Sequence, residues 1–179
     1  RKTSETLLRA TVRQHRSVTL SICDAVVPAL DGEAVDRAAF DEWERESERL
    51  TRLVTRSFNR TFADAAAANR LGMRGFELSP FVTTARQFDR LAGCLGRAAT
   101  TVDGQPGVPS DAVGSEAGSI ARSVRALVEK ASSAVLADGS VANTRALLAD
   151  SDRIVERAQA VDVAGGTGDV GLDAGRLDR

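Results

Sequence analysis

The chain has 179 residues, and 42% of them are hydrophobic, which is the size and composition of a globular chain with a substantial core. It has 24 basic and 25 acidic residues, and this balance excludes binding to nucleic acid or to a membrane surface driven by bulk charge. Aromatic residues make up only 4%, which disfavours aromatic-rich β-sandwiches and RNA-binding modules that stack bases. Every apolar run is shorter than the roughly 18 residues of a membrane span, so we expect no direct membrane insertion.

The two cysteines are Cys23 and Cys94, and their separation fits neither a metal-ligand spacing nor a disulfide framework. We therefore expect both to be small buried hydrophobic residues in a reducing, cytoplasmic compartment. The chain starts at Arg1 rather than Met and shows no signal-peptide pattern, so we expect it to belong to a longer polypeptide.

Helical periodicity dominates the sequence, and no segment shows the alternation of a β-strand. Gly32 is typical of a helix end, and Ser79 followed by Pro80 predicts a helix start. The predicted helices cover residues 5–30, 36–69, 79–101, 110–137 and 140–160. Short connections between long helices indicate antiparallel neighbours. The sequence therefore predicts an all-α, up-and-down antiparallel helical bundle.

Apolar side chains recur every three or four residues, and this spacing predicts the faces that form the core. On the first three helices the predicted core positions are Leu8, Val12, His15, Thr19, Ile22, Val26, Trp43, Ser47, Leu50, Val54, Phe58, Phe62, Phe81, Ala85, Phe88, Leu91, Ala92, Leu95 and Ala99. On the last two they are Val113, Ala117, Ile120, Val124, Leu127, Ala131, Val135, Leu147, Leu148, Ile154, Val155 and Ala158. We expect a three-helix repeat over 1–101, two helices of a second repeat over 110–161, and a Gly-rich flexible tail or truncated sixth helix over 162–179.

His15 is the only histidine, which excludes a multi-histidine metal site and leaves no second base for a serine or cysteine nucleophile. Because it lies on the apolar face of the first helix, we expect a hydrogen-bonded core histidine rather than a catalytic one. Residues 166–171 spell G-x-G-x-x-G, but no strand precedes them, so we expect a loop and no nucleotide site. The sequence thus predicts that the chain is not an enzyme.

The second helix carries acids in its first half and arginines in its second, an order that complements the helix dipole. Pairs four residues apart, such as Glu48 with Arg52, predict a solvated face whose charges pair with one another. The alternative is a surface for an anionic protein partner. That surface would be formed by Arg49, Arg52, Arg56 and Arg60.

Two carboxylates form a candidate metal site. Glu48 lies on the second predicted helix and Asp89 on the third, and these helices are expected to be adjacent and antiparallel. Such a pair can converge on a divalent cation at the surface of a bundle. The alternative is a pair of solvated helix acids that bind nothing.

Three segments together resemble the PhoU family of phosphate-uptake and phosphate-signalling regulators. They are residues 48–56, the Ser79-Pro80 pair, and the stretch from Ala85 to Leu95. In this resemblance Glu48 and Asp89 take the positions of two acidic residues of the family's motifs.

The resemblance also shows where the family's acidic motif is incomplete. Gly93 stands in place of a second acid, Cys94 in place of a common histidine, and Val155 in place of another metal ligand. The resemblance therefore implies that binding of a divalent metal is lost or weak, and it implies no other cofactor.

What the resemblance implies is a cytoplasmic, non-enzymatic regulator that acts by protein–protein contact, typically with a phosphate transporter ATPase and a sensor kinase. We expect a homodimer, because an incomplete second repeat leaves an apolar face without a partner. Nucleic acid would be contacted only through a domain outside this chain. Two alternatives remain open: a metal-binding bundle that uses Glu48 and Asp89, and a plain dimerisation scaffold.

Overall fold

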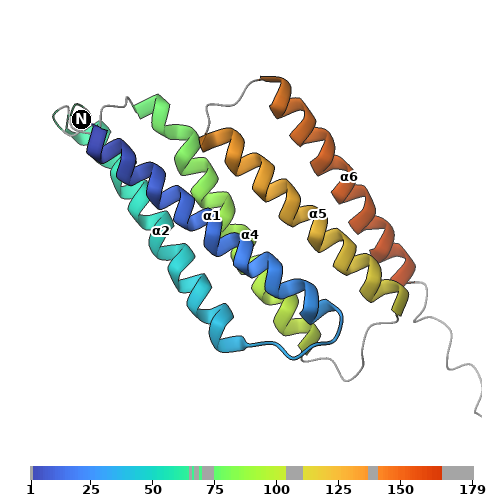
Figure 1. Ribbon diagram of the computed structural model, residues 1–179. Coiled ribbons are helices and arrows are strands. Elements are labelled where there is room, and N and C mark those ends of the chain that lie inside the picture. Colours follow the sequence, from blue (N-terminus) through green and yellow to red (C-terminus); the bar gives the residue numbers. More distant parts are fainter. Residues whose placement is uncertain are drawn as a thin grey trace, which may run out of the picture.

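The computed structural model describes residues 2–64, 66, 69, 75–103, 111–136 and 141–166. Its long elements are the helices α1 (Lys2–Leu30), α2 (Arg37–Ala63), α4 (Gly75–Asp103), α5 (Asp111–Leu136) and α6 (Val141–Gly166) (Figure 1). These described residues contain no β-strand, which confirms the all-α prediction. None of the described helices is both long and apolar enough to span a bilayer.

Consecutive helices run up and down and lie side by side (Figure 1). Helices α1, α2 and α4 pack against one another as a three-helix unit, α5 packs on α1, and α6 packs on α5 at the edge of the molecule. This arrangement places α2 and α6 on opposite sides of the bundle.

Two of the predicted helix boundaries are confirmed by the backbone. Gly32 follows α1 with φ 89°, a conformation that favours glycine. Asp36 caps the start of α2, since its carboxylate accepts a hydrogen bond from the amide of Ala39 at 3.1 Å. Helix α2 ends at Ala63, before the predicted end at residue 69, and the amide of Asp64 closes it by donating to a carbonyl of the last turn.

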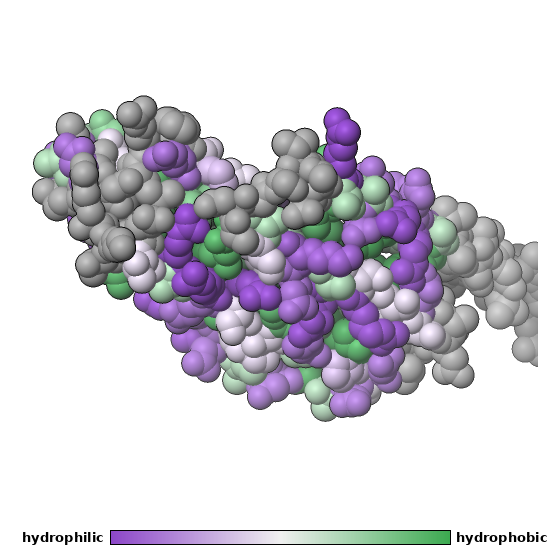
Figure 2. Space-filling model, turned by 45° about the horizontal axis from the view of Figure 1, so that its top comes forward, coloured by the Kyte–Doolittle hydropathy of each residue, from purple (hydrophilic) through white to green (hydrophobic). Residues whose placement is uncertain are grey.

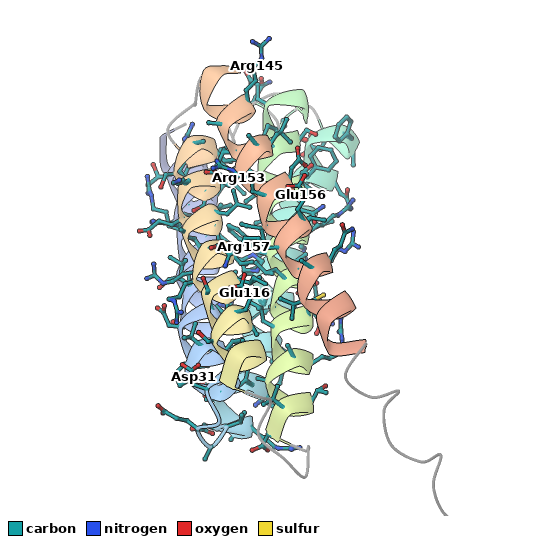
Figure 3. All side chains as sticks on the ribbon, turned by 90° about the vertical axis from the view of Figure 1, so that its right-hand side faces the viewer. Asp31, Glu116, Arg145, Arg153, Glu156 and Arg157 are labelled. Atoms are coloured by element: carbon teal, nitrogen blue, oxygen red, sulfur yellow. The ribbon has the colours of Figure 1, made fainter. Side chains whose placement is uncertain are left out.

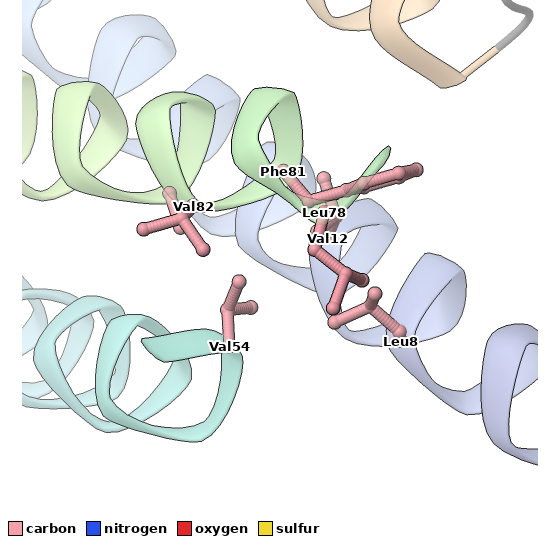
Figure 4. Packing of buried hydrophobic residues seen from close by; sticks show 7 residues of the cluster. Leu8, Val12, Val54, Leu78, Phe81 and Val82 are labelled. Atoms are coloured by element: carbon pink, nitrogen blue, oxygen red, sulfur yellow. The ribbon is translucent and has the colours of Figure 1, made fainter. Parts of the chain in front are cut away.

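The predicted start at Ser79 is wrong, because α4 already begins at Gly75. Leu78 is 1% exposed and belongs to the apolar cluster drawn in Figure 4. Burial of such a side chain stabilises a fold by about 1.5–3 kcal/mol. Pro80 lies inside α4, where its missing amide removes one backbone hydrogen bond, and the burial of Leu78 offsets part of that cost.

The core of the three-helix unit has two apolar clusters at its two ends. The first contains Leu8, Val12, Val54, Leu78, Phe81, Val82 and Ala85 (Figure 4). The second contains Ile22, Val26, Ala29, Phe40, Ala92, Ala99 and Ala121. All six predicted core positions of α1 are buried, so the helical periodicity located that face correctly.

Some other residues predicted to lie in the core are exposed instead. Phe62 is 69% exposed and stacks edge-on against the half-buried Phe58, because the last turn of α2 extends past the core. Cys23 is buried as expected, whereas Cys94 is exposed on α4.

The predicted core face of α5 is displaced. Its predicted positions from Ala117 to Val135 are all half-buried, and the buried residues are Gly114, Gly118, Ala121, Val128 and Ser132. A Cβ at Gly114 would lie 3.4 Å from the Leu30 carbonyl oxygen, which shows that α5 packs against the end of α1 at this residue. Because α5 also contacts α6 on another side, no single apolar stripe describes it.

Helix α6 is attached to α5 largely by polar contacts. The Arg157 guanidinium donates to Glu116 Oε1 at 2.7 and 2.9 Å and to the hydroxyls of Ser119 and Ser123 (Figure 3). Leu148 and Val155 are 61% and 51% exposed, so these two predicted core residues face solvent.

The end of α6 falls within the segment expected to be a tail. The helix runs to Gly166, so residues 162–166 are helical, and residues 167–179 lie outside the described residues.

On the face shown in Figure 2, hydrophilic side chains are interspersed with small hydrophobic areas.

A chain of hydrogen bonds joins α1, α2 and α4 between the two apolar clusters. His15 Nε2 lies 2.7 Å from Ser47 Oγ, and Ser47 Oγ donates to Asp89 Oδ1 at 3.3 Å. His15 and Ser47 are both 0% exposed, and the imidazole also packs edge-on against Phe88 at 5.3 Å. One residue from each helix therefore fixes the height of that helix relative to the other two.

We predict that Ser47→Ala lowers the free energy of unfolding by about 1–3 kcal/mol, because it leaves the buried Nε2 of His15 without a hydrogen-bond partner. Urea unfolding followed by circular dichroism measures this loss. Ser57→Ala is the matched control on α2, since the Ser57 hydroxyl is exposed and only donates to the Leu53 carbonyl. Equal losses in the two variants would show that the chain of hydrogen bonds contributes nothing.

Candidate functional site: a charged groove between α2 and α4

Two hollows lie end to end along the surface between α2 and α4. The first, here called the acidic hollow, has a volume of about 740 Å³ and is lined by Asp41, Glu44, Arg45, Glu48, Asp89, Ala92 and Gly93. The second, the basic hollow, has a volume of about 570 Å³ and is lined by Thr51, Arg52, Thr55, Arg56, Asn59, Arg60, Ala63 and Arg86. An ion pair between Glu48 and Arg52 lies where the two meet.

The basic hollow arises from regular spacing on α2. Arg52, Arg56 and Arg60 follow one another every four residues, which places their backbones about 6 Å apart along one side of the helix. Arg86 extends the row from α4 across the hollow. The sequence alone did not identify Arg86, because its place depends on how α4 packs against α2.

The four predicted partner-binding arginines do not all lie together. Arg49 is not among the residues lining the basic hollow, and it forms an ion pair with Glu46 at 2.6 Å. This hydrogen bond raises the pKa of Arg49 and lowers the pKa of Glu46. Arg56 and Arg60 line the hollow and form no ion pair with any residue in the described ranges.

The two predicted metal ligands, Glu48 and Asp89, do line the same acidic hollow. Each also has a protein partner, because Glu48 pairs with Arg52 and Asp89 accepts a hydrogen bond from Ser47. Among the described residues, no group of three or more histidine, cysteine or acidic side chains could hold a metal ion. The hollow thus contains both carboxylates, but within the described residues they do not form a three-ligand metal site with any neighbour.

Two further carboxylates of the acidic hollow were missed by sequence reasoning. Glu44 lies one turn and Asp41 two turns before Glu48 on α2. The Glu44 carboxylate lies so close to α4 that a Cβ at Gly96 would collide with it. The acidic half of α2, first interpreted as a solvated face, is therefore one wall of a groove.

His15 is the hydrogen-bonded core residue that the sequence predicts. Because the Ser47 hydroxyl donates its proton to Asp89, the neutral imidazole must carry its own proton on Nε2 and donate it to Ser47. Burial lowers the pKa of His15 from 6.5 to about 4, and the charge of Glu46 opposes this shift. A substrate in solvent has no access to either His15 or Ser47, since both are 0% exposed.

Comparisons with protein-family models, with curated proteins and with solved structures found no match for this chain.

We predict a pH-dependent loss of stability from His15. Since the folded-state pKa of about 4 lies below the ordinary 6.5, the unfolded chain binds a proton that the folded chain does not. Above pH 6.5 the histidine is neutral in both states and the free energy of unfolding has its full value. As the pH falls towards 4, the free energy of unfolding decreases by a total of about 3 kcal/mol.

Urea unfolding of the wild type and of His15→Gln across this pH range isolates the effect, because both proteins share all other titrating groups. The single imidazole can also be titrated by NMR. Equal pH dependence in the two proteins, or an imidazole that titrates near 6.5, would contradict the buried neutral histidine.

We also predict that a further carboxylate, placed next to Glu48 and Asp89, creates a metal site in the acidic hollow. Gly93 lies one turn after Asp89, and a Cβ there meets only the flexible Arg97 guanidinium, at 3.4 Å. The double variant Gly93→Asp/Arg97→Ala should bind Mn²⁺ about tenfold or more tightly than Arg97→Ala alone, because affinity rises with the number of carboxylates. Isothermal titration calorimetry measures the difference, and equal affinities would exclude convergence of these side chains.

Proposed function

We propose that this chain is the helical part of a PhoU-like regulator of phosphate uptake and phosphate signalling. In this proposal it acts in the cytoplasm by protein–protein contact and not as an enzyme. The stretch from Ala85 to Leu95 supports the family, and the three-helix unit followed by α5 and α6 is compatible with one complete and one incomplete repeat.

The observation that carries the contact mechanism is the basic hollow. It presents Arg56, Arg60 and Arg86 at the surface, and none of them is neutralised by an ion pair with a described residue. Guanidinium groups bind carboxylates through two parallel hydrogen bonds, so a row of them suits an acidic protein surface. Charges at the rim of an interface mainly accelerate association and select the partner.

The burial of His15 and Ser47 favours a role in protein–protein contact over a role in catalysis. The only imidazole and its serine neighbour are enclosed between α1, α2 and α4, where they hold the helices together. The basic hollow on the surface instead offers charged side chains suited to docking. We propose a phosphate transporter ATPase and a sensor kinase as the partners, following the family resemblance.

A divalent-cation site is the second candidate, favoured by the presence of Glu48 and Asp89 in one hollow. Elemental analysis of the purified chain for Fe, Zn, Mg and Mn tests it directly. A stoichiometric metal would support this candidate, and a zero for all four would remove it.

We predict that deletion of the gene disturbs phosphate uptake or the response to phosphate starvation. Wild-type protein should restore the response, whereas Arg56→Glu/Arg60→Glu should not, because the row then repels an acidic partner. Uptake of radiolabelled phosphate after transfer to low phosphate is the measurement.

Arg122→Glu/Arg145→Glu is the matched control, since it reverses two exposed arginines of α5 and α6, and Arg145 points away from the bundle (Figure 3). It should restore the response as the wild type does. An unchanged phosphate response in the deletion strain would count against the phosphate role and favour a plain scaffold.

A further inference from the structure

Two rows of polar side chains run next to one another along α2, where this helix borders the basic hollow. One row is neutral and the other is basic, and each has a member at every fourth residue. The rows are Thr51, Thr55 and Asn59, and Arg52, Arg56 and Arg60. The Thr51 hydroxyl donates to the Ala85 carbonyl of α4 at 3.1 Å, so the neutral row lies on the side of α2 next to α4. Each arginine follows a member of the neutral row by one residue and is turned away from α4 by about 100°.

The neutral row offers donors that the protein itself does not use. In a helix a serine or threonine hydroxyl often donates to a carbonyl about one turn earlier, as the Ser57 hydroxyl does to Leu53 at 3.0 Å. Thr55 is half-buried, and its hydroxyl forms no hydrogen bond within the described part of the chain. The same is true of the Asn59 side chain. Because both residues line the basic hollow, both can donate to a ligand that lies in it.

The guanidiniums of the basic hollow are also largely unused. Arg52 pairs with Glu48, whereas Arg56, Arg60 and Arg86 form no ion pair with any residue that the structure describes. Arg86 belongs to α4, so positive charge borders the hollow from both helices. The described lining contains no carboxylate, and an anion in the hollow would therefore meet no acidic side chain there.

The number of donors favours a phosphoryl group over a single carboxylate. One guanidinium already binds both oxygens of a carboxylate through two parallel hydrogen bonds. A phosphoryl group has three acceptor oxygens and about −1.5 to −2 charges at pH 7, so it can engage several donors at once. Three unpaired guanidiniums, a hydroxyl and an amide exceed what one carboxylate can use.

The dimensions of the basic hollow favour more than one phosphoryl group. Its volume of about 570 Å³ falls within the range of small-molecule sites, about 300–1,000 Å³. The backbones of Arg56 and Arg60 lie about 6 Å apart, which distributes their charges along the hollow. No aromatic residue is found in its described lining, so no described side chain there can stack on a nucleotide base.

We propose that the basic hollow is a binding site for a chain of phosphoryl groups, either inorganic polyphosphate or the triphosphate of a nucleotide. Arg56, Arg60 and Arg86 bind the phosphoryl oxygens, and Thr55 and Asn59 donate to them from the side next to α4. The site recognises the chain of phosphoryl groups and not the group attached to it.

This ligand site does not rest on the proposed phosphate role, because it follows from the side chains of the hollow alone. It uses Arg56 and Arg60, so a bound polyphosphate and an acidic protein partner exclude one another. The ligand would thus regulate docking of the partner.

Isothermal titration calorimetry of the 179-residue chain tests the choice of ligand. The probes are inorganic phosphate, tripolyphosphate and ATP, in magnesium-free buffer at about 0.15 M salt, where weak attraction between exposed charges is largely screened. Tripolyphosphate should bind about tenfold or more tightly than inorganic phosphate, because it engages more guanidiniums. ATP should match tripolyphosphate within about threefold, because the hollow does not stack on the base.

Two variants test the residues. Arg56→Gln/Arg60→Gln should weaken binding of tripolyphosphate about tenfold or more, because two charged donors are lost. Thr55→Val removes the hydroxyl without changing the charge, and it should weaken binding about threefold or more.

Each variant has a matched control. Arg122→Gln/Arg145→Gln removes the same two charges from exposed positions on α5 and α6, and it should bind tripolyphosphate as the wild type does. Thr61→Val should also bind as the wild type does, since the Thr61 hydroxyl donates to the Phe58 carbonyl and Thr61 is not among the residues lining the hollow. Circular dichroism establishes that every variant is folded.

The proposal is overturned by a wild type that binds no tripolyphosphate, or by equal losses of affinity in the variants and in their controls. Inorganic phosphate that binds as tightly as tripolyphosphate, or ATP that binds more than tenfold more tightly, would contradict recognition of the chain. Absence of binding together with a disturbed phosphate response in the deletion strain would remove the ligand and leave the proposed function. Binding together with an unchanged response would do the reverse.

Discussion

The hydrogen bonds from His15 to Ser47 to Asp89 are the constraint on which the rest of the three-helix unit depends. Apolar helices can slide past one another at small cost, because many registers bury similar areas of aliphatic surface. A buried imidazole and hydroxyl allow no such freedom, since any slide leaves a polar group without a partner. The polar chain therefore helps to select one register between the two apolar clusters.

The charged groove is a consequence of that register. Ser47 holds α4 at the height where Asp89 joins Glu48 in one hollow and Arg86 joins Arg52 in the other. The order of charges along α2 also complements the helix dipole. Stabilisation of α2 and polarisation of the groove are thus two effects of one sequence pattern.

The sequence predicts the features that depend on a single helix. The core face of α1 follows from its spacing, and the ends at Gly32 and Asp36 follow from local cap chemistry. The features that the sequence does not predict depend on contacts between neighbouring helices. Helix α4 extends to Gly75 because Leu78 finds an apolar cluster, and α5 has no single stripe because it contacts helices on two sides. Glu48 and Asp89 line one hollow because both lie on helices expected to be adjacent, whereas the place of Arg86 depends on how α4 packs against α2.

The two unusual surfaces of the molecule lie on opposite sides and have different physical characters. The groove belongs to α2 and α4, whereas the exposed Leu148 and Val155 belong to α6 at the other edge (Figure 1). Apolar contacts contribute affinity without fixing a direction, while charge layouts fix orientation and contribute less affinity. Leu148 and Val155 give α6 exposed apolar surface, whereas the acids and arginines of α2 give the groove opposite charges at its two ends. The order of charges along α2, which also complements the helix dipole, gives the groove a direction that the apolar residues of α6 do not have.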